Sequence, residues 1–193
     1  MDGQLLGWEH PAARLREALE YDHFRLYAQP VVALGCAGGT AFAEVLVRLR
    51  EEEARLLPPG DFLPAFEHYK MMAEFDRWVL RNALRRLGQG GGIRKLSVNI
   101  SAQTIEEGGF APFAAMQLRL AQLEPAALVI EIDENDALDR REACERFAAE
   151  MKGIGCQLLL DGFARRVVTF EPLKAPLVEY VKVDGSITRN VLR

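Results

Sequence analysis

Six short runs of almost continuously apolar residues recur along this chain, and segments with the period of an amphipathic helix separate them. The runs cover residues 24–34, 40–49, 95–100, 127–132, 157–160 and 178–183. Because such runs lack the polar alternation of a half-exposed strand, they indicate strands that are buried on both faces. Buried strands alternating with helices predict an α/β fold with a parallel sheet, which closes most naturally into a barrel.

The segments between these runs contain the signals that start and stop helices. A turn-and-cap sequence, Pro59-Gly60-Asp61, opens a helix at 62–68, and a longer helix at 72–87 ends at Gly88. Ser101 can cap a short helical turn, and further helices are expected at 110–123 and 139–152. The glycine-rich stretch 88–92 is a connection within this alternation, so residues 1–193 are expected to form one domain.

Composition narrows the class of protein. A net charge of −4 and an isoelectric point near 5.5 argue against binding a nucleic acid polymer or a membrane surface. The three cysteines, Cys36, Cys144 and Cys156, form no CxxC pair and suit buried thiols in a reducing compartment. Residues 1–10 lack the apolar core of a signal peptide, and no segment reaches the ~18 apolar residues of a membrane span. A cytoplasmic protein is expected.

Polar side chains interrupt the apolar runs near their carboxyl ends. They are Glu44, Asn99, Glu131, Asp161 and Lys182. The carboxyl ends of barrel strands converge on one face, where barrel enzymes have their active sites. Three carboxylates and an amide oxygen are ligands suited to Mg²⁺ or Mn²⁺, and a nearby lysine can orient a water or offset phosphate charge.

Seven short motifs, in family order over about residues 24–188, resemble those of the EAL domain family, the cyclic di-GMP phosphodiesterases of bacteria. They are Tyr27-Ala28-Gln29-Pro30-Val31, Glu44-Val45-Leu46 with Arg48, Phe62-Leu63-Pro64 through Arg77-Trp78-Val79-Leu80, Leu96-Ser97-Val98-Asn99-Ile100-Ser101, Glu131-Ile132-Asp133-Glu134, Asp161-Gly162-Phe163 and Val181-Lys182-Val183-Asp184. The resemblance implies a TIM-like (β/α) barrel, incomplete here after the sixth family strand.

The resemblance also implies two divalent cations that activate a water for hydrolysis of cyclic di-GMP. Ligands of the first ion match Glu44, Asn99, Glu131 and Asp161, and Lys182 matches the family's catalytic lysine. The second ion lacks its aspartate, replaced by Gly162, and the seventh- and eighth-strand residues are absent. We therefore expect at most one Mg²⁺ or Mn²⁺, a Lys182 without catalytic function, and no hydrolysis. The alternative is an active phosphodiesterase that tolerates Gly162.

Binding of cyclic di-GMP is a separate question. By resemblance, Gln29 and Arg48 match positions that contact the dinucleotide, and Glu134 and Asp184 are assigned to ligand binding as well. A buried strand amide and a surface ion pair are equally good interpretations of Gln29 and Arg48.

Arg165 and Arg166, in the loop after the fifth parallel strand, are interpreted as solvated rather than phosphate-binding. A barrel that stops after six strands leaves an open edge, which predicts association with a protein partner or a second copy. An inactive domain acting through protein interaction or through nucleotide binding is the function expected.

Overall fold

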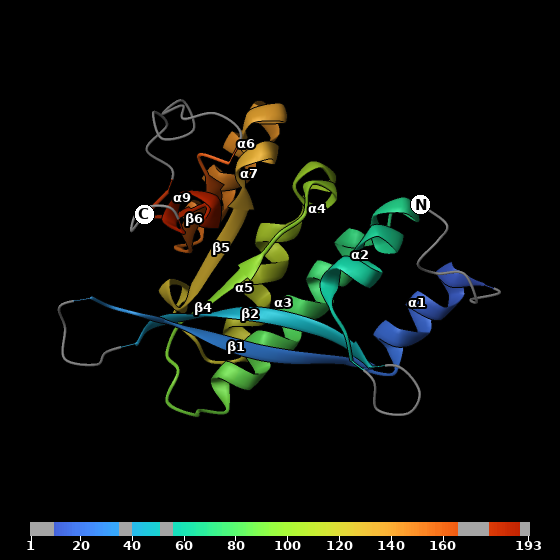
Figure 1. Cartoon of the computed structure of the whole chain (residues 1–193). Coiled ribbons are helices and arrows are strands. Elements are labelled where there is room, and N and C mark those ends of the chain that lie inside the picture. Colours follow the sequence, from blue (N-terminus) through green and yellow to red (C-terminus); the bar gives the residue numbers. More distant parts are fainter. Residues whose placement is uncertain (1–9, 35–39, 51–55, 166–177, 190–193) are drawn as a thin grey trace.

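The computed structural model of the chain describes residues 10–34, 40–50, 56–165 and 178–189 (Figure 1). The interpretations of Cys36 and Arg166 lie outside these ranges. The strands are β1 (Phe24–Val32), β2 (Thr40–Arg50), β3 (Leu56–Leu57), β4 (Leu96–Asn99), β5 (Leu128–Asp133), β6 (Gln157–Phe163) and β7 (Tyr180–Val183). They form one sheet in the order β1-β2-β4-β5-β6-β7, with β3 beside β2. All six predicted strands are therefore present.

One expectation about this sheet is wrong. From β2 to β7 the main strands pair in parallel, but β1 pairs with β2 in the antiparallel direction. Residues 33–39 connect β1 to β2, and a parallel crossover needs a dozen residues or more, usually with a helix. The first two strands consequently form a long hairpin that extends beyond the rest of the sheet (Figure 1).

The helices lie where the capping and periodicity signals placed them. The predicted ones are α2 (Pro59–His68), α3 (Met72–Gly88), α4 (Ala102–Glu107), α5 (Phe110–Leu120) and α7 (Arg141–Gly153). The amide of Thr104 donates to Oγ of Ser101, which caps α4 as expected. Within the described ranges, the helices that were not predicted are α1 (Pro11–Glu20), the 3₁₀ helix η2 (Pro125–Ala127), α6 (Glu134–Asp139) and α9 (Gly185–Thr188).

Burial on both faces explains the continuous apolar runs. Alternate residues of β2, such as Val45 and Val47, join the main core beneath the helices, in which Phe24 contacts several aromatic rings at centroid distances of 5.2–6.0 Å. The opposite face holds a second cluster of buried residues, Phe42, Val129 and Leu159. Both faces of the sheet are therefore covered where these strands lie side by side, as the fold prediction requires.

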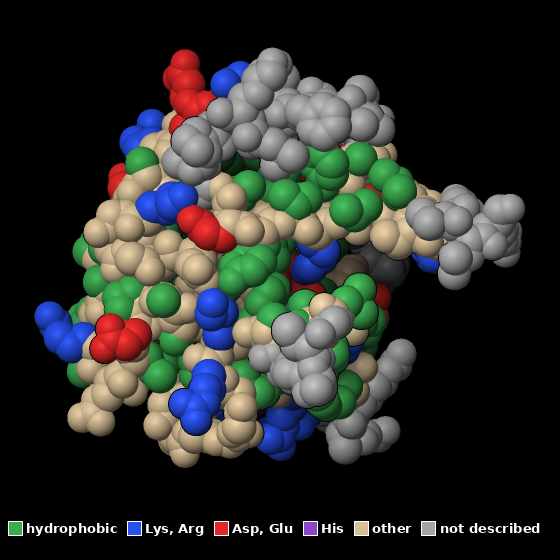
Figure 2. Space-filling view, turned by 90° about the vertical axis from the view of Figure 1, so that its left-hand side faces the viewer, with side chains coloured by type: hydrophobic (Ala, Val, Ile, Leu, Met, Phe, Trp, Pro, Cys, Tyr) green, Lys and Arg blue, Asp and Glu red, His purple; other side chains and the backbone are tan. Residues whose placement is uncertain are grey.

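The surface is mixed in character. On the face in Figure 2, Lys and Arg side chains are scattered among hydrophobic and uncharged ones. None of the helices in the described ranges is both long and apolar enough to cross a membrane.

Candidate functional site

The register of the sheet brings the predicted polar residues onto one face. Asn99 lies opposite Glu131, and Glu44 lies opposite Ser97, two residues before Asn99. Asp161 likewise lies two residues beyond Leu159, the partner of Glu131. Because side chains alternate with a period of two, offsets of two residues keep all of these side chains on the same face. Glu44 lies in the middle of β2, not near its carboxyl end as expected, because β2 continues into the hairpin with β1.

Lys182 on β7 lies among the three carboxylates. Its Nζ is 2.5 Å from Oε2 of Glu131, 3.0 Å from Oε2 of Glu44 and 3.5 Å from Oδ1 of Asp161. Asn99, which is exposed, donates its amide to Oε1 of Glu44 at 3.1 Å. The five residues that the sequence singled out thus form one connected group, which we call the charged cluster.

Burial decides the electrostatics of this cluster. Glu131 is 1% exposed, and desolvation raises the pKa of its carboxyl although Lys182 acts in the opposite direction. Desolvation also opposes the charge on Lys182, but its hydrogen bonds and attraction to Glu131 and Glu44 are stronger and raise its pKa. Oε1 of Glu131 and Oγ of Ser97 are both buried and make no other hydrogen bond among the described residues. The Ser97 hydroxyl lowers the pKa of the Glu131 carboxyl, in the same direction as Lys182, so it is the natural partner of this second oxygen.

A layer of apolar residues lies beneath the charged cluster. Phe42 and Val129 each precede a cluster residue by two positions on the same face, and the Phe42 and Tyr180 rings contact at a centroid distance of 5.2 Å. Below them Lys95 donates to Oε1 of Gln157 at 2.7 Å. The apolar layer therefore lies between the charged cluster and the hydrogen bond of Lys95 with Gln157, and it closes the charged cluster from beneath.

The predicted ligand-contacting residues of the hairpin share this face. Gln29 is opposite Glu44 on β1 and exposed, so it is not a buried strand amide. Arg48 is two residues beyond Leu46 and donates through Nη1 to the carbonyl of Val47 at 2.8 Å. With Tyr27, Leu56 and Pro58, it lines a cavity of about 240 Å³. An aromatic ring and a guanidinium therefore adjoin one hollow beside the charged cluster.

Glu134 and Asp184 have internal partners. The buried Glu134 accepts hydrogen bonds from the amides of Ala164, at 2.8 Å, and Arg165, at 3.1 Å. Asp184 caps α9 through the amide of Ser186 at 2.8 Å. Both carboxylates hold backbone in place, and their assignment to ligand binding stays a prediction.

Arg165 is exposed, as its interpretation as a solvated residue expects, but solvent is not its only partner. Its guanidinium pairs with Asp133 at 2.8 Å and with Asp184 at 3.0 Å. No local sequence signal pointed to these partners, which lie 32 and 19 residues away along the chain.

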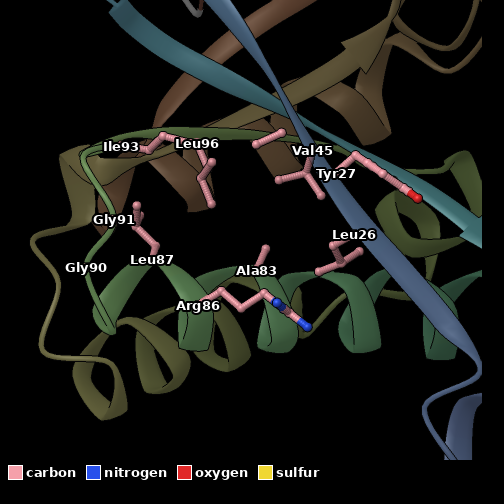
Figure 3. Close-up of a pocket in the computed structure, with 11 residues that line it drawn as sticks. Leu26, Tyr27, Val45, Ala83, Arg86, Leu87, Gly90, Gly91, Ile93 and Leu96 are labelled. Atoms are coloured by element: carbon pink, nitrogen blue, oxygen red, sulfur yellow. The ribbon is translucent and has the colours of Figure 1, made fainter.

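A second cavity lies on the helix-facing side of the sheet. It has a volume of about 180 Å³ between the hairpin, α3 and the segment before β4 (Figure 3). Leu26, Val45, Ala83 and Leu87 contribute its apolar lining. Val45 points away from the face that carries Glu44, so this cavity is separate from the charged cluster.

The donor set bears on the metal ions that the resemblance implies. Among the described residues, no group of three or more His, Cys, Asp or Glu side chains is arranged to hold a metal ion. Lys182 lies between the carboxylates instead. The chemistry of the donors, three carboxylates and one amide, fits one hard cation if Lys182 moves away from them. Gly162 offers no side-chain donor beside Asp161, so the residues present do not fit a second ion.

Comparison with known proteins agrees with this architecture. The model of the EAL domain matches residues 12–193. Cyclic di-GMP phosphodiesterase PdeF of Escherichia coli (strain K12) is 27% identical over 182 residues, which are 93% of this chain and 24% of that protein. Uncharacterized protein Rv1354c of Mycobacterium tuberculosis (strain ATCC 25618 / H37Rv) is 30% identical, over 92% of this chain and 29% of that one. The chain thus spans about a quarter of the length of these relatives.

Solved structures of EAL domains are similar to this chain in fold. The FimX EAL domain from Pseudomonas aeruginosa bound to c-di-GMP superposes with a TM-score of 0.87 at 30% identity, covering 95% of this chain and 74% of that one. The PaMucR phosphodiesterase in its c-di-GMP complex gives 0.84 at 25% identity, covering 95% and 76%. The predicted fold class, a TIM-like barrel of the EAL type, is confirmed. The chain belongs to the EAL domain family.

Proposed function

We propose that this EAL domain acts in cyclic di-GMP signalling by binding the dinucleotide without hydrolysing it. The lack of a side-chain donor at Gly162, beside Asp161, carries this proposal, because hydrolysis with two metal ions needs a second ion that the residues present do not fit. Support for the ligand comes from relatives: the FimX and PaMucR structures, similar over 95% of this chain, are complexes with c-di-GMP.

A single Mg²⁺ or Mn²⁺ would be held by Glu44, Asn99, Glu131 and Asp161 after Lys182 withdraws. Such an ion, when bound, polarises phosphoryl oxygens and lowers the pKa of a water. Glu44 is held by Asn99, so binding of the ion exchanges existing contacts for new ones.

Recognition of the dinucleotide would use the hairpin. Arg48 would pair with a phosphate oxygen, since a guanidinium matches that geometry with two donors. Tyr27 is 49% exposed beside the same cavity and offers a ring on which a base can stack. Gln29 is exposed opposite Glu44 and would donate or accept a hydrogen bond.

Calorimetry with cyclic di-GMP on the full chain, with and without Mg²⁺, tests this function. We expect binding in the wild type and a loss of about tenfold or more in Arg48→Ala, from removal of a charge-assisted contact. Arg119→Ala, an exposed arginine at the end of α5, is the matched control and should bind normally. Chromatography of the same mixtures should show no linear dinucleotide. Turnover that Glu44→Ala abolishes would instead establish the alternative, an active phosphodiesterase.

One observation favours a second candidate, a protein-interaction module. In the described part of the chain, β1 pairs only with β2 and β7 only with β6, which leaves one side of each strand without a partner strand. Unpaired strand edges are templates for another chain. Pro30 lies within β1 and removes one donor, so β7 is the better template. Light scattering over a range of concentrations tests self-association, and a monomer throughout would exclude a second copy as the partner.

A further inference from the structure

The loop after β6 places a guanidinium where the preceding strand has no side chain. Gly162 has a φ of 72°, and a Cβ on it would lie 2.4 Å from Nη2 and 2.6 Å from Cζ of Arg165. These separations are shorter than any real Cβ contact. A Cβ at residue 162 would therefore force the guanidinium, the far end of a flexible side chain, to shift from its observed position.

The partners of Arg165 come from the two neighbouring strands. Asp133 is the last residue of β5 and Asp184 follows β7, and in each carboxylate one oxygen caps a helix while the other pairs with Arg165. Oδ1 of Asp133 caps α6 and Oδ2 pairs with Arg165 at 2.8 Å. Oδ1 of Asp184 caps α9 and Oδ2 pairs with Arg165 at 3.0 Å. One arginine thus joins the starts of two helices across the end of β6.

The backbone of the loop is fixed to suit this contact. The amide of Arg165 donates both to the carbonyl of Gly162, at 3.0 Å, and to the buried Glu134, at 3.1 Å. These hydrogen bonds anchor the backbone of the short turn that carries Arg165, whereas the arginine side chain can move. A side chain introduced at residue 162 would require the guanidinium to move, and at a φ of 72° it would also strain the backbone of the turn.

We propose that Arg165 is a built-in cation at the carboxyl ends of β5, β6 and β7, and that with it the residues here do not fit the second divalent ion that the family resemblance implies. The inference rests on the proposed non-hydrolytic function and gives its physical cause. Position 162 lacks a carboxylate, and a fixed positive charge between Asp133 and Asp184 opposes a further cation. Gly162, which its φ of 72° favours in any case, leaves the space beside it to the guanidinium.

A double-mutant cycle on the full chain tests the pair. Arg165→Ala should lower the melting temperature of the wild type and leave that of Gly162→Ala unchanged, because the added Cβ has already displaced the guanidinium. The strain of a non-glycine residue at positive φ is present in both Gly162→Ala proteins and cancels. Gly185 and Arg189 provide the control cycle, since a Cβ at Gly185 would be 3.6 Å from Nη2 of Arg189, an ordinary contact.

Mn²⁺ titration followed by electron paramagnetic resonance adds a second readout. The wild type should bind at most one Mn²⁺, and Gly162→Asp/Arg165→Ala should bind one more. Additive losses in the cycle, or an unchanged number of Mn²⁺ ions in that double variant, would overturn the inference. Hydrolysis by the wild type would overturn the proposed function without affecting the cycle, so the two failures are distinguishable.

Discussion

The ammonium nitrogen of Lys182 lies 2.5 Å from Oε2 of Glu131, a carboxylate whose side chain is completely buried. A buried charge without a partner is costly, so this ion pair holds β7 to β5 across β6. Lys182 itself is 33% exposed and also contacts Glu44 and Asp161. The lysine is therefore both a structural counter-ion and the group with which any metal ion must compete.

Replacing Lys182 with methionine should destabilise the protein and strengthen metal binding. Removal of the ammonium leaves the buried Glu131 carboxylate unpaired, which we expect to lower the free energy of unfolding by about 2 kcal/mol, less than for a fully buried pair. Added Mg²⁺ should raise the melting temperature of Lys182→Met more than that of the wild type. Glu131→Gln/Lys182→Met is the control, because it lacks the buried charge. Equal responses to Mg²⁺ in wild type and Lys182→Met would contradict this interpretation.

The buried Asp76 of α3 should make stability depend on pH. Oδ2 accepts hydrogen bonds from Thr104 Oγ1 at 2.6 Å and from Ser101 Oγ at 2.7 Å, yet burial is stronger and raises the pKa of this carboxyl to about 6. Because the folded-state pKa is above the unfolded value, the stabilisation is complete below the unfolded pKa of 3.8 and is lost as pH rises through about 6.

Asp76→Asn removes this titration. Urea denaturation at about pH 4.5 and about pH 7.5 should show the variant gaining on the wild type as pH rises, by at most about 3 kcal/mol. Glu74→Gln, an exposed position on the same helix, is the control and should leave the pH dependence unchanged. A wild-type-like pH profile in Asp76→Asn would show that Asp76 is not the titrating group.

Two helix-ending glycines should respond oppositely to alanine. A Cβ on Gly88, the last residue of α3, would lie 2.6 Å from the carbonyl oxygen of Ala121, a backbone atom that cannot move aside. A Cβ on Gly153, the last residue of α7, would meet nothing within 4 Å. We expect Gly88→Ala to cost about 2 kcal/mol and Gly153→Ala to gain about 0.5 kcal/mol. Guanidinium denaturation measures both, and a gain in Gly88→Ala would refute the close approach.

The apolar cavity of Figure 3 should accept a larger side chain at Ala28. Ala28→Ile would fill part of the cavity from β1 and raise the free energy of unfolding by about 1 kcal/mol. Ala28→Thr is the matched control, because threonine is also branched at Cβ and common in strands but has a hydroxyl where isoleucine has an ethyl group. Isoleucine should therefore be more stabilising than threonine in urea denaturation. If the two variants are equally stable, the cavity does not take up the side chain.

Strand period alone placed Asn99, Glu131 and Asp161 on one face, and the register of the sheet has them there, while their role as metal ligands stays a prediction. Each lies at the end of an apolar run, and parallel strands bring such positions to one end. The antiparallel direction of β1 was missed because periodicity carries no information about strand direction, although the short 33–39 connection would have revealed it. Glu44 was placed at a strand end because the apolar pattern did not show that β2 continues beyond it, paired with β1.

The sequence by itself determined the α/β class, the positions of the strands and the set of polar residues near their ends, because hydrophobic period and local caps act over a few residues. Only the tertiary structure decided which charges pair. Lys182 meets a glutamate 51 residues away, and Arg165 meets Asp133 and Asp184 over a glycine that leaves room for it. Such contacts depend on register and on the space left by a missing Cβ, which no local pattern encodes. From the sequence, Gly162 showed only the lack of a carboxylate. In the structure, the guanidinium of Arg165 lies beside that glycine.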